Sequence, residues 1–266
     1  MNKNSLLENK VAIITGASRG IGRATALLLA EAGASVVLVA RSANSIQALA
    51  DEIKGNGGNA LAIPTDVTNQ ADVDLLITMT MRAFRQVDIL INNAGVLHPI
   101  GKTWEVSPQA WENLMRINVL GPYFCARAIL PHMLERGDGR IINVSSGAAY
   151  KNIVGWGAYC ASKAALDRFT GVLAEEVSDT NVVVTAFNPG TTDTQMQADI
   201  RQTTTQTFPN GDFFRQLHET GKLFKPEEPA QLILWLASEF GEDKNGQIFD
   251  FGDPETRDVI AQELAI

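Results

Sequence analysis

Short apolar runs alternate with helical patterns along most of the chain. The runs are bounded by turn residues and rich in Val, Ile and Leu, which predicts buried strands. They occupy residues 11–14, 35–40, 60–63, 88–91, 140–144, 182–187 and 247–251. Amphipathic patterns predict helices over 21–32, 45–54, 69–85 and 108–136, and helices that begin near residues 159 and 227. This alternation predicts an α/β fold: a doubly wound, seven-stranded parallel sheet with helices on both faces.

Two stretches depart from the simple alternation. Gly121 and Pro122 interrupt the 108–136 pattern and predict a bend in that helix. Residues 191–225 show no clear periodicity and are rich in Thr, Gln and Phe. Because this segment follows the carboxyl end of a strand, where open α/β sheets bind ligands, we expect an irregular substrate lid there.

Length and charge narrow the class of protein. The chain of 266 residues has no repeat or linker, so we expect one domain over residues 1–266. The formal net charge of −8 argues against nucleic acid or an anionic membrane as a partner. The N-terminus lacks a signal-peptide pattern, and no window approaches the roughly 18 apolar residues of a membrane span. The chain is therefore expected to be soluble and cytoplasmic.

The cysteines and histidines predict no metal site. Cys125 and Cys160 lie among apolar and small residues, which predicts free buried thiols in a reducing compartment. His98, His132 and His218 form no pair with the spacing of zinc ligands.

A glycine-rich turn, TGASRGIG, follows the first predicted strand at residues 15–22. Its glycines, Gly16, Gly20 and Gly22, would let the backbone approach a pyrophosphate, while the next helix offers N–H donors and a partial positive charge. The spacing differs from the common G-x-G-x-x-G, and a plain tight turn is the alternative interpretation. Its position in an alternating chain favours a dinucleotide site.

The end of the second strand predicts which dinucleotide binds. An acidic residue there would suit the 2′-hydroxyl of NAD, whereas basic residues suit the 2′-phosphate of NADP. The strand ends at Ala40 and is followed by Arg41 and Ser42, and Arg19 lies in the glycine turn. We expect the two guanidiniums and the hydroxyl to converge on a phosphate, which favours NADP(H). Two solvated arginines are the alternative.

Tyr159 and Lys163 stand four residues apart at the start of a predicted helix, on one face and one turn apart. A nearby ammonium lowers the pKa of a phenol, so this tyrosine is expected to exchange a proton near neutral pH. Taken alone, the pair also fits a surface lysine beside a half-buried tyrosine.

Together these motifs resemble a known family. The sequences TGASRGIG, NNAG at residues 92–95, the serine pair at 145–146 and YCASK at 159–163 occur in the order and spacing of a short-chain dehydrogenase/reductase. The resemblance covers residues 10–252 and implies a single Rossmann-type domain, assembled as a homotetramer or homodimer.

The resemblance implies four catalytic residues. Tyr159 is similar to the family's acid/base, and Lys163 to the lysine that lowers its pKa and holds the nicotinamide ribose. The family's serine lies thirteen residues before the tyrosine, which selects Ser146 rather than Ser145 for the substrate carbonyl. Asn118 is similar to the asparagine that orders a water in the proton relay.

The resemblance also implies the cofactor contacts. They come from the glycine turn, the ends of strands two to four, the catalytic pair and a Pro-Gly segment. These are Gly16, Ser18, Arg19, Gly20, Ile21, Gly22, Arg41, Ser42, Asp66, Val67, Asn92, Ala94, Gly95, Tyr159, Lys163, Pro189, Gly190, Thr192 and Thr194. Thr192 replaces the usual Ile or Val, and residues 250–254 replace the usual D-G-G turn, which leaves the tail packing open.

The function implied is an NADPH-dependent reductase of ketones or aldehydes, acting reversibly on a small molecule with Tyr159 as proton donor. A 3-oxoacyl-thioester reductase of lipid synthesis and a non-catalytic NADP-sensing protein remain as alternatives. Ile153, Val154 and Trp156 are expected to border the substrate. Four apolar residues are candidates for the lid: Phe208, Phe213, Phe214 and Leu217.

Overall fold

The seven predicted strands form and pair in one parallel sheet. The computed structural model describes residues 5–205 and 208–264. Its strands are β1 (Val11–Thr15), β2 (Ser35–Ala40), β3 (Asn59–Pro64), β4 (Ile89–Asn92), β5 (Gly139–Val144), β6 (Val182–Asn188) and β7 (Ile248–Asp250). They lie in the order β3-β2-β1-β4-β5-β6-β7. All residues of β1 and β6 are buried, as expected for central strands covered on both faces.

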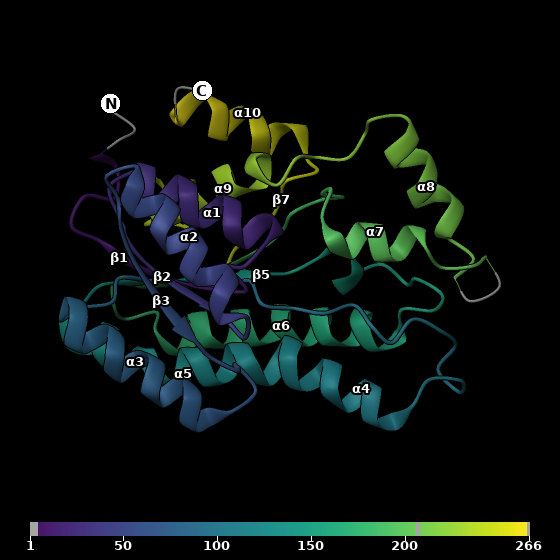
Figure 1. Ribbon diagram of the computed structural model, residues 1–266, viewed down its shortest axis with the longest axis horizontal. Coiled ribbons are helices and arrows are strands. Elements are labelled where there is room, and N and C mark those ends of the chain that lie inside the picture. The colour runs from purple at the N-terminus through teal and green to yellow at the C-terminus, as the bar shows by residue number, and fades with distance from the viewer. Residues whose placement is uncertain (1–4, 206–207, 265–266) are drawn as a thin grey trace.

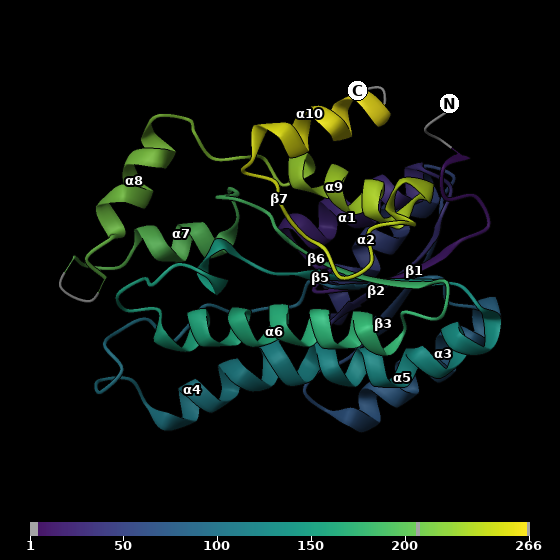
Figure 2. The ribbon, with the colours of Figure 1, turned by 180° about the vertical axis from the view of Figure 1, so that it is seen from behind.

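Helices cover both faces of the sheet (Figures 1 and 2). On one face lie α1 (Gly20–Glu31), α2 (Ala43–Gly55), α9 (Glu227–Ala237) and α10 (Pro254–Glu263). On the other lie α3 (Gln70–Phe84), α4 (Pro108–Met115), α5 (Gly121–Arg136) and α6 (Gly157–Glu176). Each layer buries its apolar side chains against the sheet in a separate cluster. The predicted doubly wound α/β fold is confirmed.

The direction of winding changes between β1 and β4. The chain runs outward from β1 to β3, returns through α3, and places β4 on the other side of β1. The loops after these two strands leave the sheet in opposite directions, which opens a crevice at the carboxyl edge. The topology therefore positions a ligand site next to the glycine-rich turn.

The bend in the long helix lies before the predicted position. The interruption is a π-helical turn over Arg116–Leu120, between α4 and α5. Pro122 lies in the first turn of α5, where a backbone N–H needs no helical partner. The helical pattern is thus interrupted directly before the predicted position at Gly121 and Pro122, and Asn118 lies at the centre of the π turn.

The segment 191–225 is not the irregular loop that we expected. It contains α7 (Gln195–Arg201) and α8 (Gly211–Glu219), which extend beyond one end of the sheet (Figure 1). Both helices are short, and neither has a side-chain cap at its N-terminus. Thr194 and Asn210 occupy the N-cap positions but form no cap hydrogen bond, so the stability of these short helices depends on packing against neighbouring elements.

The tail packs against the outer helices. Asp253 caps α10 by accepting a hydrogen bond from the backbone N–H of Glu255, and Pro254 occupies the first turn. Trp235 on α9 donates its indole N–H to Glu263 at 2.5 Å. Two single turns of 3-10 helix, Gly147–Ala149 and Glu239–Gly241, complete the described helices.

Both cysteines are free thiols. Cys125 is buried, but Cys160 is only half-buried, and its sulfur donates to the carbonyl of Lys151. The prediction of two buried thiols was therefore wrong for Cys160. Among the described residues, no helix has the length and apolar character needed to cross a bilayer.

Candidate active site

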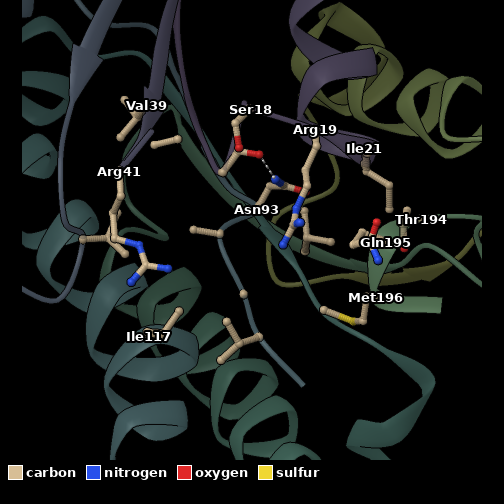
Figure 3. Close-up of a pocket in the computed structure, with 18 of the residues that line it drawn as sticks. Ser18, Arg19, Ile21, Val39, Arg41, Asn93, Ile117, Thr194, Gln195 and Met196 are labelled. Carbon is tan, nitrogen blue, oxygen red and sulfur yellow. Dashed lines mark hydrogen bonds between the residues drawn. The ribbon is translucent and has the colours of Figure 1, made fainter. Parts of the chain in front are cut away.

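A cavity of about 290 Å³ opens at the carboxyl edge of the sheet (Figure 3). Its walls come from the β1–α1 turn, the ends of β2 and β3, residues 93–96, the end of β5, α6 and the start of α7. Most of the predicted cofactor residues line it. They are Gly16, Ser18, Arg19, Gly20, Ile21, Arg41, Asp66, Val67, Ala94, Gly95, Tyr159, Lys163, Pro189 and Thr194.

Glycine is required in the β1–α1 turn because the backbones there are in close contact. Gly16 has φ +67°, and a Cβ on it would lie 2.8 Å from Asn93 Nδ2 and 2.9 Å from Ala94 Cα. A Cβ on Gly22 would overlap the carbonyl oxygen of Gly16. Gly22 does not line the cavity; it acts by keeping α1 close to β1.

The N-terminus of α1 points into this cavity. Its N-cap residue, Arg19, has extended backbone and forms no side-chain cap. Residues 18–21 line the cavity, so the first N–H groups of the helix have no capping side chain beside it. Uncapped N–H groups and the positive end of the helix dipole form a site for an anionic group.

Thr15 and Asn93 hold the two walls of the cavity together. The Thr15 hydroxyl donates to the carbonyl of Ile91 and accepts from the backbone N–H groups of Asn93 and Ala94, both at 3.0 Å. Asn93 Nδ2 donates to the carbonyls of Thr15 and Gly16. The sequence analysis predicted neither role, because nothing in the pattern distinguishes Thr15 from other residues at a strand end, and the contact was assigned to Asn92.

Asn92 lies outside the cavity. It is 3% exposed and donates to Asn143 Oδ1 at 2.9 Å; Asn143 in turn donates to the Thr170 hydroxyl at 2.9 Å. This chain of bonds ties β4 to β5 and α6. Asn92 therefore steadies the central strands, as expected, but does not reach the cavity where a ribose contact was expected.

Arg19 and Arg41 are exposed, and neither has a hydrogen-bonded or ion-paired side chain within the described part of the chain. Figure 3 shows both side chains reaching into the cavity, Arg41 towards Ile117 and Arg19 on the side of Thr194 and Gln195. Ser42 does not join them. Its hydroxyl is 2.8 Å from that of Ser45 at the start of α2, outside the cavity.

The segment after β6 is fixed by packing on Phe224. A Cβ on Gly190 would lie 2.8 Å from the ring of Phe224. Thr192 is buried, donates to the carbonyl of Pro189 at 3.0 Å and pairs with Phe224 through a backbone bridge. Only Pro189 and Thr194 face the cavity, so Gly190 and Thr192 shape the turn from behind.

Tyr159 and Lys163 lie on α6 with their side chains buried, 6% and 5% exposed. Lys163 Nζ lies 5.7 Å from the centroid of the Tyr159 ring and donates to the carbonyl of Val144 at 2.7 Å. Both residues line the cavity. The helical spacing therefore brings them together as predicted, at the end of β5.

Burial, rather than Lys163, dominates the protonation of Tyr159. Burial raises the pKa of Tyr159 to about 12, against an opposing effect of a hydrogen bond with Ser146. Burial also lowers the pKa of Lys163 to about 8, which the carboxylate of Asp167 opposes. The expectation of a lowered tyrosine pKa was therefore wrong for this state: the phenol stays protonated at neutral pH and is ready to donate.

The adjacent residues Ser145 and Ser146 have different partners. Ser146 Oγ caps a turn by accepting from the N–H of Ala148 at 3.2 Å and reaches Tyr159. Ser145 lines the cavity, and its hydroxyl lies next to the carboxylate of Asp167. Burial raises the pKa of Asp167, and the interactions with Ser145 and Lys163 only partly oppose this rise.

Asn118 anchors the turn opposite Lys163. It is 1% exposed, its Oδ1 accepts from Val96 N and its Nδ2 donates to Val96 O, both at 2.9 Å. Nδ2 also donates to the Ser162 hydroxyl. A Cβ on Gly95 would lie within 4 Å of both Asn118 Oδ1 and Lys163 Nζ, so glycine there leaves room between them. The side chain is thus largely occupied in holding residues 93–96.

The geometry agrees with comparisons to known proteins. A family model described as short chain dehydrogenase matches residues 10–205. The chain belongs to this family. A 3-oxoacyl-[acyl-carrier-protein] reductase from Synechocystis sp. is 36% identical over 234 residues, which cover 88% of this chain and 91% of the relative. Versicolorin reductase 1 of Aspergillus parasiticus is 34% identical over 259 residues, covering 93% and 97%.

Solved structures show the same likeness. The crystal structure of a 3-ketoacyl-(acyl-carrier-protein) reductase from Brucella melitensis, complexed with NADH, has a TM-score of 0.80 at 33% identity and covers 92% of this chain and 97% of that one. The chain is thus an oxidoreductase of the short-chain dehydrogenase family, acting on CH–OH and C=O groups of small molecules.

The cavity fits the nicotinamide dinucleotide that this family uses. The uncapped N-terminus of α1 suits a pyrophosphate, and the unpaired arginines beside it suit further phosphate charge. At the other end, the Tyr159 hydroxyl and Lys163 suit ribose and carbonyl oxygens. All of these residues line the same cavity.

Proposed function

We propose that this oxidoreductase uses NADPH to reduce a ketone or an aldehyde to an alcohol, reversibly. The observation that supports the proposal is the buried, protonated Tyr159 beside Lys163 and Ser146, in a cavity that is also lined by Arg19 and Arg41, neither of which has a side-chain partner among the described residues. A protonated phenol is the form that can donate to a carbonyl oxygen during reduction.

The preference for NADPH rests on the end of β2. This strand ends at Ala40 without a carboxylate, and Arg41 and Arg19 reach the cavity with no anionic partner in the described residues. Guanidiniums bind a phosphate dianion through charge-assisted hydrogen bonds, whereas a 2′-hydroxyl gives them no charge to bind.

Each catalytic residue then has a task. When bound, the cofactor supplies the hydride. Ser146 donates a hydrogen bond to the substrate carbonyl, and Tyr159 gives its proton to the same oxygen as charge develops there. Lys163 holds ribose hydroxyls and compensates the phenolate that remains, while Asn118 keeps residues 93–96 in place.

Replacing Tyr159 with Phe tests this assignment. We expect kcat to fall about 10²- to 10⁴-fold, because proton donation is lost, with NADPH affinity retained. The measurement is NADPH oxidation over a panel of aldehydes, ketones, steroids, sugars and acyl thioesters, with NADH in parallel. Tyr123→Phe, at an exposed tyrosine on α5, is the matched control. Substantial turnover by Tyr159→Phe, or equal kcat/KM with NADH in the wild type, would refute the corresponding half of the proposal.

A second candidate is a 3-oxoacyl-thioester reductase. The names of the Synechocystis relative and of the Brucella structure favour it. The acyl-thioester arm of the panel distinguishes it, because such an enzyme would prefer thioesters to simple ketones. A non-catalytic NADP-sensing protein is less well supported, since all four catalytic residues are present and grouped.

We further propose that α7, α8 and Phe208 form the substrate lid of a single-domain enzyme. Phe208 and Phe214 are buried against the elements around Tyr159, whereas Phe213 is 57% exposed. Positions 206 and 207 of the predicted lid, and positions 1–4 and 265–266 of the predicted domain, lie outside the described residues.

We also propose a homotetramer or homodimer in the cytoplasm. Leu120, Tyr123 and Val172 expose apolar side chains on the outer helix layer, 37–48% accessible, as a subunit contact would require. The two free thiols support a reducing compartment. Sedimentation velocity measures the assembly state directly.

A further inference from the structure

Trp156 lies at the centre of a stack of aromatic rings beside the catalytic tyrosine. Its ring stacks on Phe208 at 5.1 Å between centroids and on Phe214 at 5.4 Å. It meets Tyr159 edge to face at 5.6 Å. We call Trp156, Phe208 and Phe214 the aromatic stack. The ring of Tyr159 is therefore in direct edge-to-face contact with the indole.

The indole N–H of Trp156 is buried without an acceptor. The side chain is only 5% exposed, and within residues 5–205 and 208–264 its Nε1 has no hydrogen-bond partner. A buried donor left unpaired costs free energy, and tryptophans in protein interiors normally find an acceptor. No acceptor for this donor lies among residues 5–205 and 208–264, which leaves the indole N–H available to a ligand that supplies one.

The aromatic stack adjoins the catalytic end of the cavity. Tyr159, Val96 and Met196 line the cavity and also belong to the apolar cluster that contains the stack (Figure 3 shows Met196 at the cavity wall). A substrate carbonyl held by Ser146 and Tyr159 therefore has the rest of its molecule against this cluster. The rings that the substrate must meet or displace are Phe208 and Phe214.

The backbone fixes Trp156 more firmly than its two lid partners. Trp156 is the N-cap of α6, its carbonyl accepts from Cys160 N at 2.8 Å, and it pairs with Gly101 through a backbone bridge. Phe208 and Phe214 come instead from the segment that carries the two short, uncapped helices.

We propose that Trp156 determines substrate specificity, and that the substrate carries a flat ring which stacks on the indole in place of a lid phenylalanine and an oxygen acceptor that receives the indole N–H. This deepens the proposed carbonyl reduction and depends on it. The substrate class is a planar aromatic or polycyclic ketone with a second oxygen, rather than an open-chain aliphatic ketone.

A substrate series with the wild-type enzyme tests the ring. 2-Tetralone and 2-decalone both carry an unconjugated ketone, but the second ring is flat in the tetralone and saturated in the decalone, so kcat/KM is expected to favour the tetralone about tenfold from ring stacking. Equal values for the pair would overturn the stacking part of the proposal.

Methoxytetralones with the oxygen at successive ring positions test the acceptor. One position is expected to gain about 3- to 10-fold in kcat/KM over the parent tetralone from a hydrogen bond to the indole N–H. In Trp156→Phe, which keeps a ring but has no donor, that gain should disappear while the parent tetralone is still reduced. Trp104→Phe, at a tryptophan 79% exposed, is the matched control and should leave the gain unchanged.

A binding experiment covers the case in which Trp156→Phe fails to fold. In the NADPH complex of Tyr159→Phe, the favoured methoxytetralone should bind tighter than tetralone by the same factor and quench tryptophan fluorescence. Equal affinities would reject the acceptor. Absence of turnover with every carbonyl would instead reject the proposed function, and turnover of aliphatic ketones at rates equal to aryl ketones would reject only the role of Trp156.

Discussion

The proposed cofactor end and the proposed substrate end of the candidate active site are held together by different kinds of contact. At the cofactor end, backbone lies against backbone: Gly16 touches Ala94, and Thr15 and Asn93 hold the turn through main-chain groups. At the substrate end, side chains pack on side chains, with Trp156, Phe208 and Phe214 in mutual ring contact. At the cofactor end, Gly16 and Gly22 leave no room for a larger side chain, whereas the rings at the substrate end contact one another only through side chains.

This difference explains why the cofactor end can be predicted from sequence motifs and the substrate end cannot. A backbone in close contact restricts a position to glycine or to one hydrogen-bonding type, which leaves a motif. A cluster of rings accepts many apolar residues of similar size, so it produces an apolar composition in the sequence but no motif. A dinucleotide site can therefore be predicted from the sequence, whereas the residues that contact the substrate can be identified only in the folded structure.

Gly16→Ala should break the cofactor end most severely. The left-handed backbone at φ +67° and the overlap with Ala94 together are expected to cost about 3 kcal/mol and to weaken NADPH binding. Urea unfolding and a fluorescence titration measure the two effects. Gly171→Ala, in α6 with no atom within 4 Å of its new Cβ, should instead stabilise the fold by up to about 1 kcal/mol. Equal stability of the two variants would contradict the close-contact account.

Arg41→Asp should alter the cofactor end without damaging it. Loss of a guanidinium from the 2′-phosphate, with a negative charge in its place, should lower the preference for NADPH over NADH about 30-fold. The ratio of kcat/KM for the two cofactors measures this. Arg168→Asp, at an exposed arginine of α6 outside the cavity, is the control. An unchanged ratio in Arg41→Asp would remove Arg41 from the phosphate site.

Asp167→Asn probes the boundary between the two ends. Lys163, with a pKa of about 8, is charged below that pH and neutral above it, and Asp167 supports the charge. Without the carboxylate the pKa of Lys163 falls, so the alkaline loss of reductase kcat/KM should move about one pH unit lower. Asp167→Glu should restore the profile, and Asp179→Asn, at an exposed site, should leave it unmoved. A profile unchanged in Asp167→Asn would show that Lys163 does not need this partner.

Phe214→Leu should have the smallest effect, confined to the substrate end. Loss of ring stacking on Trp156 and Phe208 is expected to cost about 1 kcal/mol of local stability in α7 and α8. Hydrogen exchange of these helices should rise while the urea midpoint and NADPH affinity stay near wild type. Phe213→Leu, at the exposed neighbour, should change exchange less. A global loss of stability in Phe214→Leu would mean that the lid is part of the main core.

The sequence analysis succeeded where local chemistry decides the structure. The seven strands follow from apolar runs, and the helical spacing of Tyr159 and Lys163 correctly predicted a shared face. It failed for α7 and α8, whose ends carry no side-chain caps and whose stability comes from contacts distant in sequence. It also predicted Asn92, and not Asn93, as a cavity residue. The two side chains point in different directions, and the sequence does not show that β4 ends at Asn92 and that Asn93 begins the loop beside the cavity.

By itself, the sequence determined the succession of strands and helices along the chain, the glycine turn and the residue types of the proposed catalytic group. Each of these depends on neighbours within one helical turn or one strand. Tertiary structure alone decided which groups are buried and what faces them. Burial sets the protonation of Tyr159 and Lys163, and chain segments more than fifty residues apart bring Phe208 and Phe214 onto Trp156. The physical reason is that desolvation and ring packing depend on the surrounding atoms, whichever part of the chain supplies them.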